Sequence, residues 1–503
     1  MEQCTLVIKD HVNVKFEGLD PFVRRKINEA LKFFVPYARH MPSFKMGRWD
    51  GKIGFATVGG ATYLNLLDRV LPIVLENGYD ITLDDRREER LFEFPEITEK
   101  MFSHKVWPEG HVLAGEPIEL RDYQAEAIRT YVANLASIQS ISTGAGKTLL
   151  TASLSYLCEP HGRTIVIVPS KSLVEQTEED YRNLGLDVGV FYGDRKEWGH
   201  THTISTWQSL SVFAKKVRNK KGKVIELDFD VSLETVDPDS GTRLEDFLKG
   251  IVCVMVDEVH SAKAKELKDL LTGPMANIPI RWGLTGTIPK EDFEYLSIVA
   301  SLGPVVGEIR ASDLQEQDVL AKCNIEILQL VDDIEYNDYH TEYDYLVNNP
   351  ERLAFIGKTC RAIAETGNTL ILVDRLETGE ILAEAIPNSV FISGKVKTKN
   401  RSKEYKEVQL SENKVIIATY GVAAVGINIP RIFNLVLVEA GKSFVRVIQS
   451  IGRGLRKAHD KDEVAIYDVT STAKFSKRHL AKRKAFYKEA GYPSQVKKVT
   501  YRA

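Results

Sequence analysis

The sequence contains few cysteines for its length. Its 503 residues include only Cys4, Cys158, Cys253, Cys323 and Cys360, which are odd in number, far apart and without a CxxC pair. This spacing argues against a disulfide framework and against a structural zinc held by cysteines. We therefore expect reduced thiols in a cytoplasmic protein.

Long apolar runs are also absent. No stretch approaches the roughly 18 apolar residues of a membrane span. The N-terminal MEQCTLVIKDHVNV carries acids and no sustained apolar core, so no signal peptide is expected. With 43% hydrophobic and 27% charged residues and no long low-complexity tract, the composition is that of a globular protein. At this length, about three to four domains are expected.

The net charge of -3 offers no global attraction for nucleic acid, so any such binding must come from local patches. One basic patch is the segment 471–503, whose single acid is Glu489; it is either a solvated helix face or a binding surface. A second is SFKMGRWDGKIGF (43–55), where three cations alternate with aromatic residues. This stretch is either a nucleic-acid grip or an ordinary small hairpin.

The hydrophobic pattern predicts an α/β fold with a small domain in front. Residues 1–95 combine short β-like runs with one helical stretch near RRKINEALKFF, which is typical of a small α+β domain. From residue 118 the pattern becomes buried strands (SIQSIS, TIVIVPS, HTISTW, IVCVMVDE) separated by helices, and a second such series follows (TLILVD, SVFISG, KVIIATY, LVLVEA, EVAIYDV). We expect four parts: 1–95, 96–310, 311–472 and a basic helical extension, 473–503.

A phosphate loop is predicted at SISTGAGKT (140–148), where a strand runs into a helix. Gly144 and Gly146 let backbone N–H groups turn toward an anion at the helix N-terminus. Lys147 would hold the β and γ phosphates of ATP, and Thr148 would bind Mg²⁺. Thr143 and Ala145 complete the loop. The general pattern GxxxxGK[ST] has a glycine where Ile141 stands, so this loop is a variant.

A carboxylate pair is predicted to complete the ATP site. The apolar strand IVCVMVDE ends in Asp257 and Glu258. Asp257 would organise the metal, and Glu258 would polarise the attacking water. Alone, an apolar strand ending in two acids is common; beside a lysine loop it indicates ATP hydrolysis.

Four motifs in this order, STGAGKT, DEVH, LTGT and QSIGRGLR, resemble those of superfamily 2 helicases over about residues 118–470. The resemblance implies two tandem RecA-like domains, ATP and Mg²⁺ as cofactors, and a nucleic-acid-stimulated ATPase. It implies adenine recognition by LRDYQ, through Arg121 and Gln124, and coupling of the two sites by LTGT. The strand backbone would be held by Pro169, Ser170, Lys171, Gln176, Thr206, Gln208 and Thr419.

The second domain would supply the remaining ATP contacts. The segment ATYGVAAVGINIP resembles the fifth helicase motif, with Gly426 and Asn428 near the nucleotide, although the family often has Asp at position 428. In QSIGRGLR, Gln449, Arg453 and Arg456 would face the phosphates, because a rigid guanidinium can meet charge spread over planar oxygens. ATP bound between two domains would close them, and hydrolysis would release them.

The arrangement of the whole chain is similar to that of phage members of this family. That likeness implies 3′-to-5′ helicase action on branched DNA (stalled forks, Holliday junctions, D-loops, R-loops) in recombination, repair and replication. Single-stranded DNA and RNA–DNA hybrids would be further partners, with accessory proteins possible and no membrane. Lys45, Arg48, Trp49 and Lys52 would then meet duplex phosphates. A double-strand translocase, a DExH-type RNA helicase and a non-catalytic binder are the alternatives; the segment 211–250 could be a strand-separating hairpin or a solvated loop.

Overall fold

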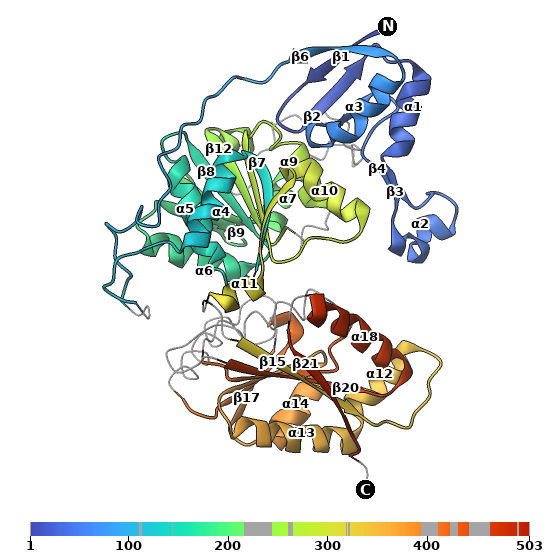
Figure 1. Ribbon diagram of the computed structural model, residues 1–503, viewed down its shortest axis with the longest axis vertical. Helices are drawn as coiled ribbons and strands as arrows, with labels where there is room; N and C mark the ends of the chain where they lie inside the picture. The colour runs from blue at the N-terminus through green and yellow to red at the C-terminus, as the bar shows by residue number, and fades with distance from the viewer. Residues whose placement is uncertain are drawn as a thin grey trace. The chain divides into compact units, whose positions relative to one another are not determined.

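The computed structural model describes residues 2–109, 113–142, 144–215, 244–259, 265–317, 319, 322–393, 411–422, 431–441, 463–489 and 492–501. Its contacts divide the chain into two compact units, residues 1–140 with 147–308 and residues 141–146 with 309–503 (Figure 1). Within the described ranges, no helix has the length and apolar character needed to cross a bilayer.

The N-terminal part of the first unit is a small α+β domain. Its sheet has the order β5-β2-β1-β6, and β1 pairs antiparallel with β2 and parallel with β6. The elements are β1 (Glu2–Ile8), β2 (Asn13–Glu17), β5 (Ala61–Tyr63), β6 (Tyr79–Asp85), α1 (Pro21–Ala30) and α3 (Leu67–Glu76). The sequence predicted a single helix here. The second helix, α3, buries Val70 and Val74, which are one turn apart and face the core.

A hairpin projects from this domain. Strand β3 (Lys32–Phe34) pairs antiparallel with β4 (Lys52–Gly54). Between them lie the 3₁₀-helix η1 (Pro36–His40) and the short α2 (Pro42–Lys45). The segment 43–55 therefore contains the end of α2, a turn and the second strand of the hairpin.

The small domain packs on the first α/β domain. The His11 amide donates to the Ala276 carbonyl (3.1 Å), and Asn13 Nδ2 donates to the Thr272 carbonyl (2.8 Å). Lys268 Nζ lies 4.3 Å from the ring centroid of Phe55. Buried side chains of both parts form one continuous hydrophobic core, so the small domain has a fixed position on its neighbour.

The first α/β domain is built on an eight-stranded sheet with the order β10-β9-β11-β8-β12-β13-β7-β14. The pairs from β9 through β7 are parallel, and β10 is antiparallel to β9. The strands are β7 (Ala136–Ile141), β8 (Arg163–Val168), β9 (Val188–Tyr192), β10 (Arg195–Lys196), β11 (His202–Thr206), β12 (Ile251–Asp257), β13 (Ile280–Thr285) and β14 (Val305–Ile309). The helices are α4 (Asp122–Ala133), α5 (Lys147–Cys158), α6 (Lys171–Asn183), α7 (Trp207–Lys215), α8 (Leu244–Leu248), α9 (Lys265–Thr272) and α10 (Asp292–Leu302). The four strands predicted in the first series are confirmed as β7, β8, β11 and β12.

The second unit contains a seven-stranded sheet with the order β17-β18-β16-β19-β20-β15-β21, whose pairs are parallel. Its strands are β15 (Lys322–Leu330), β16 (Thr369–Val373), β17 (Ser389–Ile392), β18 (Val415–Thr419), β19 (Asn434–Val438), β20 (Glu463–Ser471) and β21 (Ser494–Val499). Among the described residues of this unit the helices are α11 (Ala311–Glu316), α12 (Tyr339–Asn348), α13 (Pro350–Ala364), α14 (Leu376–Ala385) and α18 (Lys474–Glu489). The five strands of the second predicted series are all present, so the α/β class and the two tandem domains are confirmed.

The C-terminal segment is integrated into the second sheet. After β20 the chain forms α18 and then returns as β21, which pairs in parallel with β15 and forms the edge of the sheet. The basic extension expected from residue 473 thus contains an edge strand as well as a helix. All but the last residue of β21 are exposed, so SQVKKV lacks a clear alternation of apolar and polar residues. For this reason the sequence did not predict the strand.

Candidate functional site

The phosphate loop and the carboxylate pair follow strands that lie near each other in one parallel sheet. Strand β13 lies between β12 and β7, with Asp257 beside Leu284 and Thr285 beside Ser140. Neighbouring strands are about 4.8 Å apart, so the two carboxyl ends are about 10 Å apart. This is the edge where parallel sheets bind ligands.

Lys147 and Glu258 are in direct contact. Lys147 Nζ donates to Glu258 Oε1 at 2.6 Å, and the two side chains are only 10% and 12% exposed. Lys147 is the first residue of α5, and Glu258 directly follows β12. The lysine predicted to hold phosphate and the carboxylate predicted to act on water are therefore brought together by the fold.

The backbone at Glu258 is unusual. Its φ is +53°, a left-handed conformation that residues with a side chain seldom adopt. Such a conformation costs on the order of 1 kcal/mol and persists where the surrounding structure enforces it, often at functional sites. Here it turns the carboxylate after β12 back toward Lys147.

The preceding acid, Asp257, is held in an environment that disfavours its charge. Burial raises the pKa of Asp257 to about 6; Lys147 opposes this rise, and the like charge of Glu258 adds to it. The Glu258 amide donates to Asp257 Oδ1 at 2.9 Å and so fixes the carboxylate. A carboxylate that is costly to charge when alone is suited to binding a cation.

The loop between β7 and α5 has the backbone form that a phosphate cradle needs. Gly144 and Gly146 have φ values of +91° and +81°, in the region that favours glycine. The Ala145 amide donates to the Ser142 carbonyl (3.3 Å), which closes the turn. The groups present fit a Mg²⁺–triphosphate. The loop offers backbone donors and Lys147 a cation for phosphate, while Thr148 offers a hydroxyl and Asp257 a carboxylate for the metal. Thr143 lies outside the described residues.

The LTGT motif follows β13, between the two strand ends. Thr285 Oγ1 donates to the Thr287 carbonyl at 2.8 Å, and the Thr287 amide lies 3.3 Å from Thr285 Oγ1. The Thr287 hydroxyl is buried and has no hydrogen-bond partner among the described residues. A buried hydroxyl without a partner is costly, so this group is available to a ligand or to a neighbouring motif at the edge.

The residues predicted to read adenine lie at the start of α4. Gln124 is buried, and its Oε1 accepts a hydrogen bond from the Arg121 amide at 3.0 Å, which satisfies one free N–H at the helix start. Arg121 is exposed and lies close to Tyr123, with Nη1 3.3 Å from the hydroxyl. The adenine contact stays a prediction; the structure adds a capping role for Gln124.

The predicted strand-binding segments lie at adjacent strand ends. Val168 of β8 is beside Thr206 of β11, and each strand runs directly into a helix, α6 or α7. Ser170 Oγ accepts from the Leu173 amide (3.4 Å), and Thr206 Oγ1 accepts from the Ser209 amide (3.4 Å). Two capped helix N-termini thus lie side by side, an arrangement that favours phosphate. Pro169 precedes α6, Gln176 is partly buried within it, and Gln208 is exposed at the start of α7.

A cluster beside this segment was not predicted. Lys171 Nζ lies 5.2 Å from the ring centroid of Tyr192, and the Arg195 guanidinium lies 5.9 Å from it. Arg195 also pairs with Glu178 of α6 (2.8 Å), and this pairing lowers the pKa of Glu178. The cluster fixes α6 against the turn after β9. Its sequence signal was the apolar run VGVFY followed by GDRK, a strand ending in cations.

In the second unit, Thr419 ends β18 at the carboxyl edge and lies beside Val373 of β16. Its hydroxyl lies 3.4 Å from the Val422 amide. The other residues predicted to act from this half lie outside the described residues; they are Gly426, Asn428, Gln449, Arg453 and Arg456. The greater part of segment 211–250, residues 216–243, is also outside them.

The N-terminal basic stretch forms the projecting hairpin tip. Lys45, Arg48 and Lys52 are exposed, as the predicted phosphate contacts require. Trp49 is partly buried, and its indole Nε1 donates to the Lys52 carbonyl at 2.8 Å. Gly51 has φ of +76°, and a Cβ there would be 2.7 Å from the Phe34 ring. Trp49 therefore holds the shape of the tip, while the three cations are presented outward.

Two family models match the chain. Residues 117–290 match "Type III restriction enzyme, res subunit", and residues 352–458 match "Helicase conserved C-terminal domain". The ATP-dependent DNA helicase uvsW of Enterobacteria phage T4 is 22% identical over 470 residues, which are 89% of this chain and 87% of the relative. The DNA 3'-5' helicase XPB of Kineococcus radiotolerans is 24% identical over 76% of this chain and 65% of the relative.

Solved structures agree on the fold. The Type ISP restriction-modification enzyme LlaBIII bound to DNA has a TM-score of 0.55 at 14% identity and covers 87% of this chain and 36% of that one. Dbp5 of S. cerevisiae bound to RNA and ADP BeF3 has a TM-score of 0.52 at 15% identity, over 76% of this chain and 90% of that one. With the phosphate-loop lysine, the strand-end carboxylates and both domain matches in place, the chain is a superfamily 2 helicase, a nucleic-acid-dependent ATPase that resembles UvsW.

Proposed function

We propose that this chain is an ATP-dependent DNA helicase that acts on branched DNA, with 3′-to-5′ polarity. Its substrates would be stalled forks, Holliday junctions, D-loops and R-loops, in recombination, repair and replication. The observation that carries the proposal is the contact between Lys147 and Glu258, because it joins the two halves of an ATP-hydrolysis site within a helicase chain. The likeness to uvsW over 89% of the chain supports the DNA substrate.

ATP would bind with Mg²⁺ held by Thr148 and Asp257, and Lys147 would hold the phosphates. Lys147 would then pair with the γ-phosphate in place of its 2.6 Å contact with Glu258, and the Glu258 carboxylate would be free to orient water. Binding of ATP would thus also release Glu258 to act on water. Gln449, Arg453 and Arg456 would approach the phosphates from the second domain, with Gly426 and Asn428 near the nucleotide.

The strand would cross the carboxyl edge of both sheets. In the first domain the N-termini of α6 and α7 supply adjacent backbone donors, and Lys171 supplies a charge beside them. In the second domain Thr419 is at the equivalent edge. Contacts of this kind hold phosphate and carry no sequence information, which suits a motor that moves along any strand.

Selection of branched DNA would come from the small domain. It is fixed on the first motor domain and presents Lys45, Arg48 and Lys52 at the tip of its hairpin, so duplex phosphates bound there keep a set distance from the motor. If the chain is phage-encoded like its T4 relative, it would act in the cytoplasm of the infected host.

The test is a comparison of substrates. ATPase stimulation is measured side by side with single strands, plain duplex, forks, four-way junctions and RNA–DNA hybrids, and strand release is measured with a labelled fork. The proposal expects the highest stimulation with forks and junctions, and ATP-dependent release of the labelled strand. Equal stimulation by plain duplex and fork, without strand release, would contradict it.

A double-strand translocase is the second candidate. The family match to a restriction-enzyme subunit and the fold shared with LlaBIII favour it, as does the match to a protein called DNA 3'-5' translocase XPB2 from Sulfurisphaera tokodaii. Such a motor would consume ATP on plain duplex and release no strand. Because the chain shares its fold with Dbp5, which was solved bound to RNA, an RNA substrate is the third candidate that the ATPase comparison tests.

A further inference from the structure

Helix α18 has a solvent face made only of cations and alanines. The sequence from Lys474 to Lys488 contains no acidic residue. The exposed residues of this stretch are Lys474, Lys477, Arg478, Ala481, Lys482, Lys484, Ala485 and Lys488. With 3.6 residues per turn they share one side of the helix, and the buried Leu480, Arg483 and Tyr487 lie on the other.

The cations are arranged in two rows. Arg478 and Lys482 follow one flank of the face, and Lys477, Lys484 and Lys488 follow the other. Ala481 and Ala485 lie between the rows, and their short side chains leave a shallow depression along the centre of the face. Among the residues that the structure describes, none of Lys477, Lys482, Lys484 and Lys488 pairs with a carboxylate, whereas Lys497 of the neighbouring β21 pairs with Glu326 (2.7 Å). The charge of this face is therefore available to a partner.

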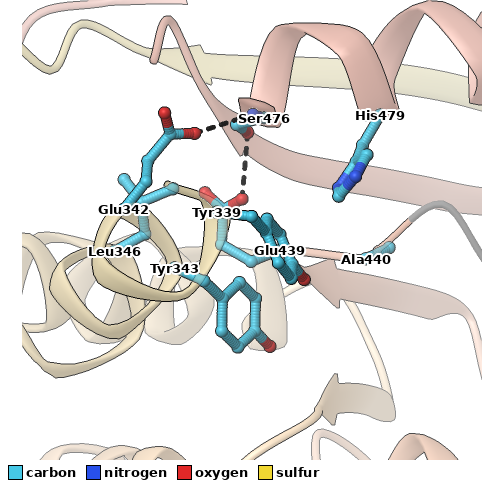
Figure 2. A pocket seen from close by; sticks show the side chains of 8 residues that line it. All are labelled: Tyr339, Glu342, Tyr343, Leu346, Glu439, Ala440, Ser476 and His479. Carbon is cyan, nitrogen blue, oxygen red and sulfur yellow. Dashed lines mark hydrogen bonds between the residues drawn. The ribbon is translucent and has the colours of Figure 1, made fainter. Parts of the chain in front are cut away.

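The helix is firmly anchored. Arg483 donates to both oxygens of Asp468 (2.8 and 2.9 Å), and the Tyr487 hydroxyl donates to the same carboxylate (2.8 Å). At the other end Glu342 accepts from the amides of Phe475 and Ser476 (2.9 and 2.8 Å), and Ser476 Oγ donates to Glu439 (Figure 2). Because Glu342 already occupies the positive helix end, an outside anion would meet the side of α18 rather than its N-terminus.

Aromatic contacts connect this face to the carboxyl edge of the sheet. Tyr339 lies 5.1 Å from His479 of α18 and 5.5 Å from Tyr343, measured between ring centroids (Figure 2). The Arg375 guanidinium lies 5.8 Å from the Tyr343 ring, and Arg375 stands two residues after Val373, the last residue of β16, which pairs with Thr419. A nucleic acid on α18 would thus be continuous with the strand path predicted at Thr419.

We propose that α18 lies in the major groove of duplex DNA, with its two rows of cations on the phosphates of the two strands. The groove of B-form DNA is about 12 Å wide and admits one helix, and the alanines allow the helix axis to come close to the groove floor. The 16 residues of α18 span about 24 Å, or about seven base pairs. This inference rests on the proposed DNA substrate and gives the second unit a duplex contact of its own.

The charge test uses one cation from each row. Lys482→Gln with Lys484→Gln, in the full-length chain, should weaken binding of a linear 20-base-pair DNA duplex by about tenfold at low salt. It should also reduce the slope of log affinity against log salt by about 1.8, because each lost phosphate contact removes about 0.9. The matched control, Lys358→Gln with Arg361→Gln, removes two exposed cations from α13 and should bind as the wild type does.

The groove test changes shape without charge. Ala481→Gln with Ala485→Gln fills the centre of the face with neutral side chains and should also weaken duplex DNA binding several-fold. An RNA duplex of the same sequence should be bound more weakly than DNA by the wild type and be insensitive to this change, because its A-form major groove is too narrow for a helix. Thermal unfolding midpoints equal to the wild type show that each variant is folded.

Wild-type affinity for duplex DNA in either the lysine or the alanine variant overturns the inference. Its failure differs from failure of the proposed function, which is judged by the ratio of fork to linear-duplex affinity in the wild type. Loss of α18 contacts lowers both affinities and leaves that ratio unchanged, whereas a wild type without fork preference contradicts the branched-DNA proposal alone.

Discussion

Lys147 Nζ donates to Glu258 Oε1 at 2.6 Å, so the lysine predicted to hold phosphate and the carboxylate predicted to act on water neutralise each other. Both side chains are nearly buried, which makes their contact stronger than a surface ion pair and makes either charge costly when left alone. In the proposed mechanism, ATP would supply a replacement partner for Lys147 before Glu258 could leave. The pair would then keep Glu258 from acting on water until phosphate is bound.

Lys147→Ala should abolish ATP turnover, because the triphosphate loses its cationic anchor and Glu258 loses its partner. DNA affinity measured without nucleotide should fall less than about threefold, since Lys147 is assigned to the proposed phosphate site and not to the proposed strand-binding segments. The readouts are steady-state ATPase activity and fluorescence anisotropy with a labelled strand. Lys249→Ala removes an exposed lysine from the same domain and serves as control. Normal turnover in the Lys147 variant would refute the phosphate-loop assignment.

Mg²⁺-dependent nucleotide binding should weaken as the pH falls through about 6. The pKa of Asp257 is raised from the ordinary 3.8 to about 6, chiefly by burial, so this carboxyl is protonated below that pH and then cannot hold a cation. Glu258→Gln removes the negative charge that raises the pKa of Asp257. It also removes the carboxylate that competes with Asp257 for the charge of Lys147. Both changes lower the pKa of Asp257, so the midpoint should move to lower pH.

The measurement is the affinity for a non-hydrolysable ATP analogue, with and without Mg²⁺, between pH 5 and 8. A hydrolysis assay is not needed, so the loss of turnover in Glu258→Gln does not interfere. Glu245→Gln, at an exposed site on α8, should leave the midpoint where it is in the wild type. A midpoint that stays constant or rises in Glu258→Gln contradicts the arrangement of charges described for this site.

The parts of the fold that could be predicted were those with strong local signals. Strands such as IVCVMVD are continuous buried runs, and all nine predicted strands of the two α/β domains are present. Strand β13, which carries Leu284 and Thr285, was not predicted because Arg281 interrupts its apolar run. In the fold this arginine is buried, and its guanidinium donates hydrogen bonds to the backbone carbonyls of Leu271, Met275 and Ser301.

The contacts within the candidate site could be predicted only in part. Motif spacing identified Lys147 and Glu258 separately, but their pairing and the left-handed φ at Glu258 depend on β12 and β7 being separated by a single strand. The cluster of Tyr192 and Arg195 with Glu178 depends on tertiary contacts between α6 and the turn after β9. The periodicity of hydrophobic residues predicts local structure and not such tertiary contacts.

Arg456→Ala should slow ATP hydrolysis by at least about a hundredfold and leave nucleotide affinity nearly unchanged, because its guanidinium is predicted to meet charge that develops in the transition state. This prediction rests on the QSIGRGLR motif. Single-turnover hydrolysis and equilibrium nucleotide binding separate the two effects. A loss of affinity with an unchanged hydrolysis rate constant would show that Arg456 binds ground-state ATP instead.

Arg352→Leu should destabilise the second unit by about 3–5 kcal/mol, because Arg352 is fully buried between two carboxylates. It lies 3.3 Å from Asp332 and contacts Glu439, and removing it leaves two buried negative charges without their partner. Burial already raises the pKa of Glu439, which Arg352 opposes. Denaturant unfolding measures the change, with Arg361→Leu on the exposed side of the same helix as control. Equal midpoints for the two variants would mean that the buried network contributes little.

The tip of the N-terminal hairpin allows its charges to be tested apart from its shape. Arg48→Ala with Lys52→Ala removes two exposed cations and should weaken fork binding about tenfold and reduce its salt dependence by about two phosphate contacts. Lys26→Ala with Arg69→Ala removes two exposed cations from α1 and α3 and is the matched control. Trp49→Phe removes the bond from the indole to the Lys52 carbonyl, which costs about 1 kcal/mol of stability, and keeps an aromatic ring, so it should largely preserve fork binding. Fork affinity that falls as far in the control as in the tip variant would show that the small domain attracts DNA through its general charge and that the hairpin has no special role.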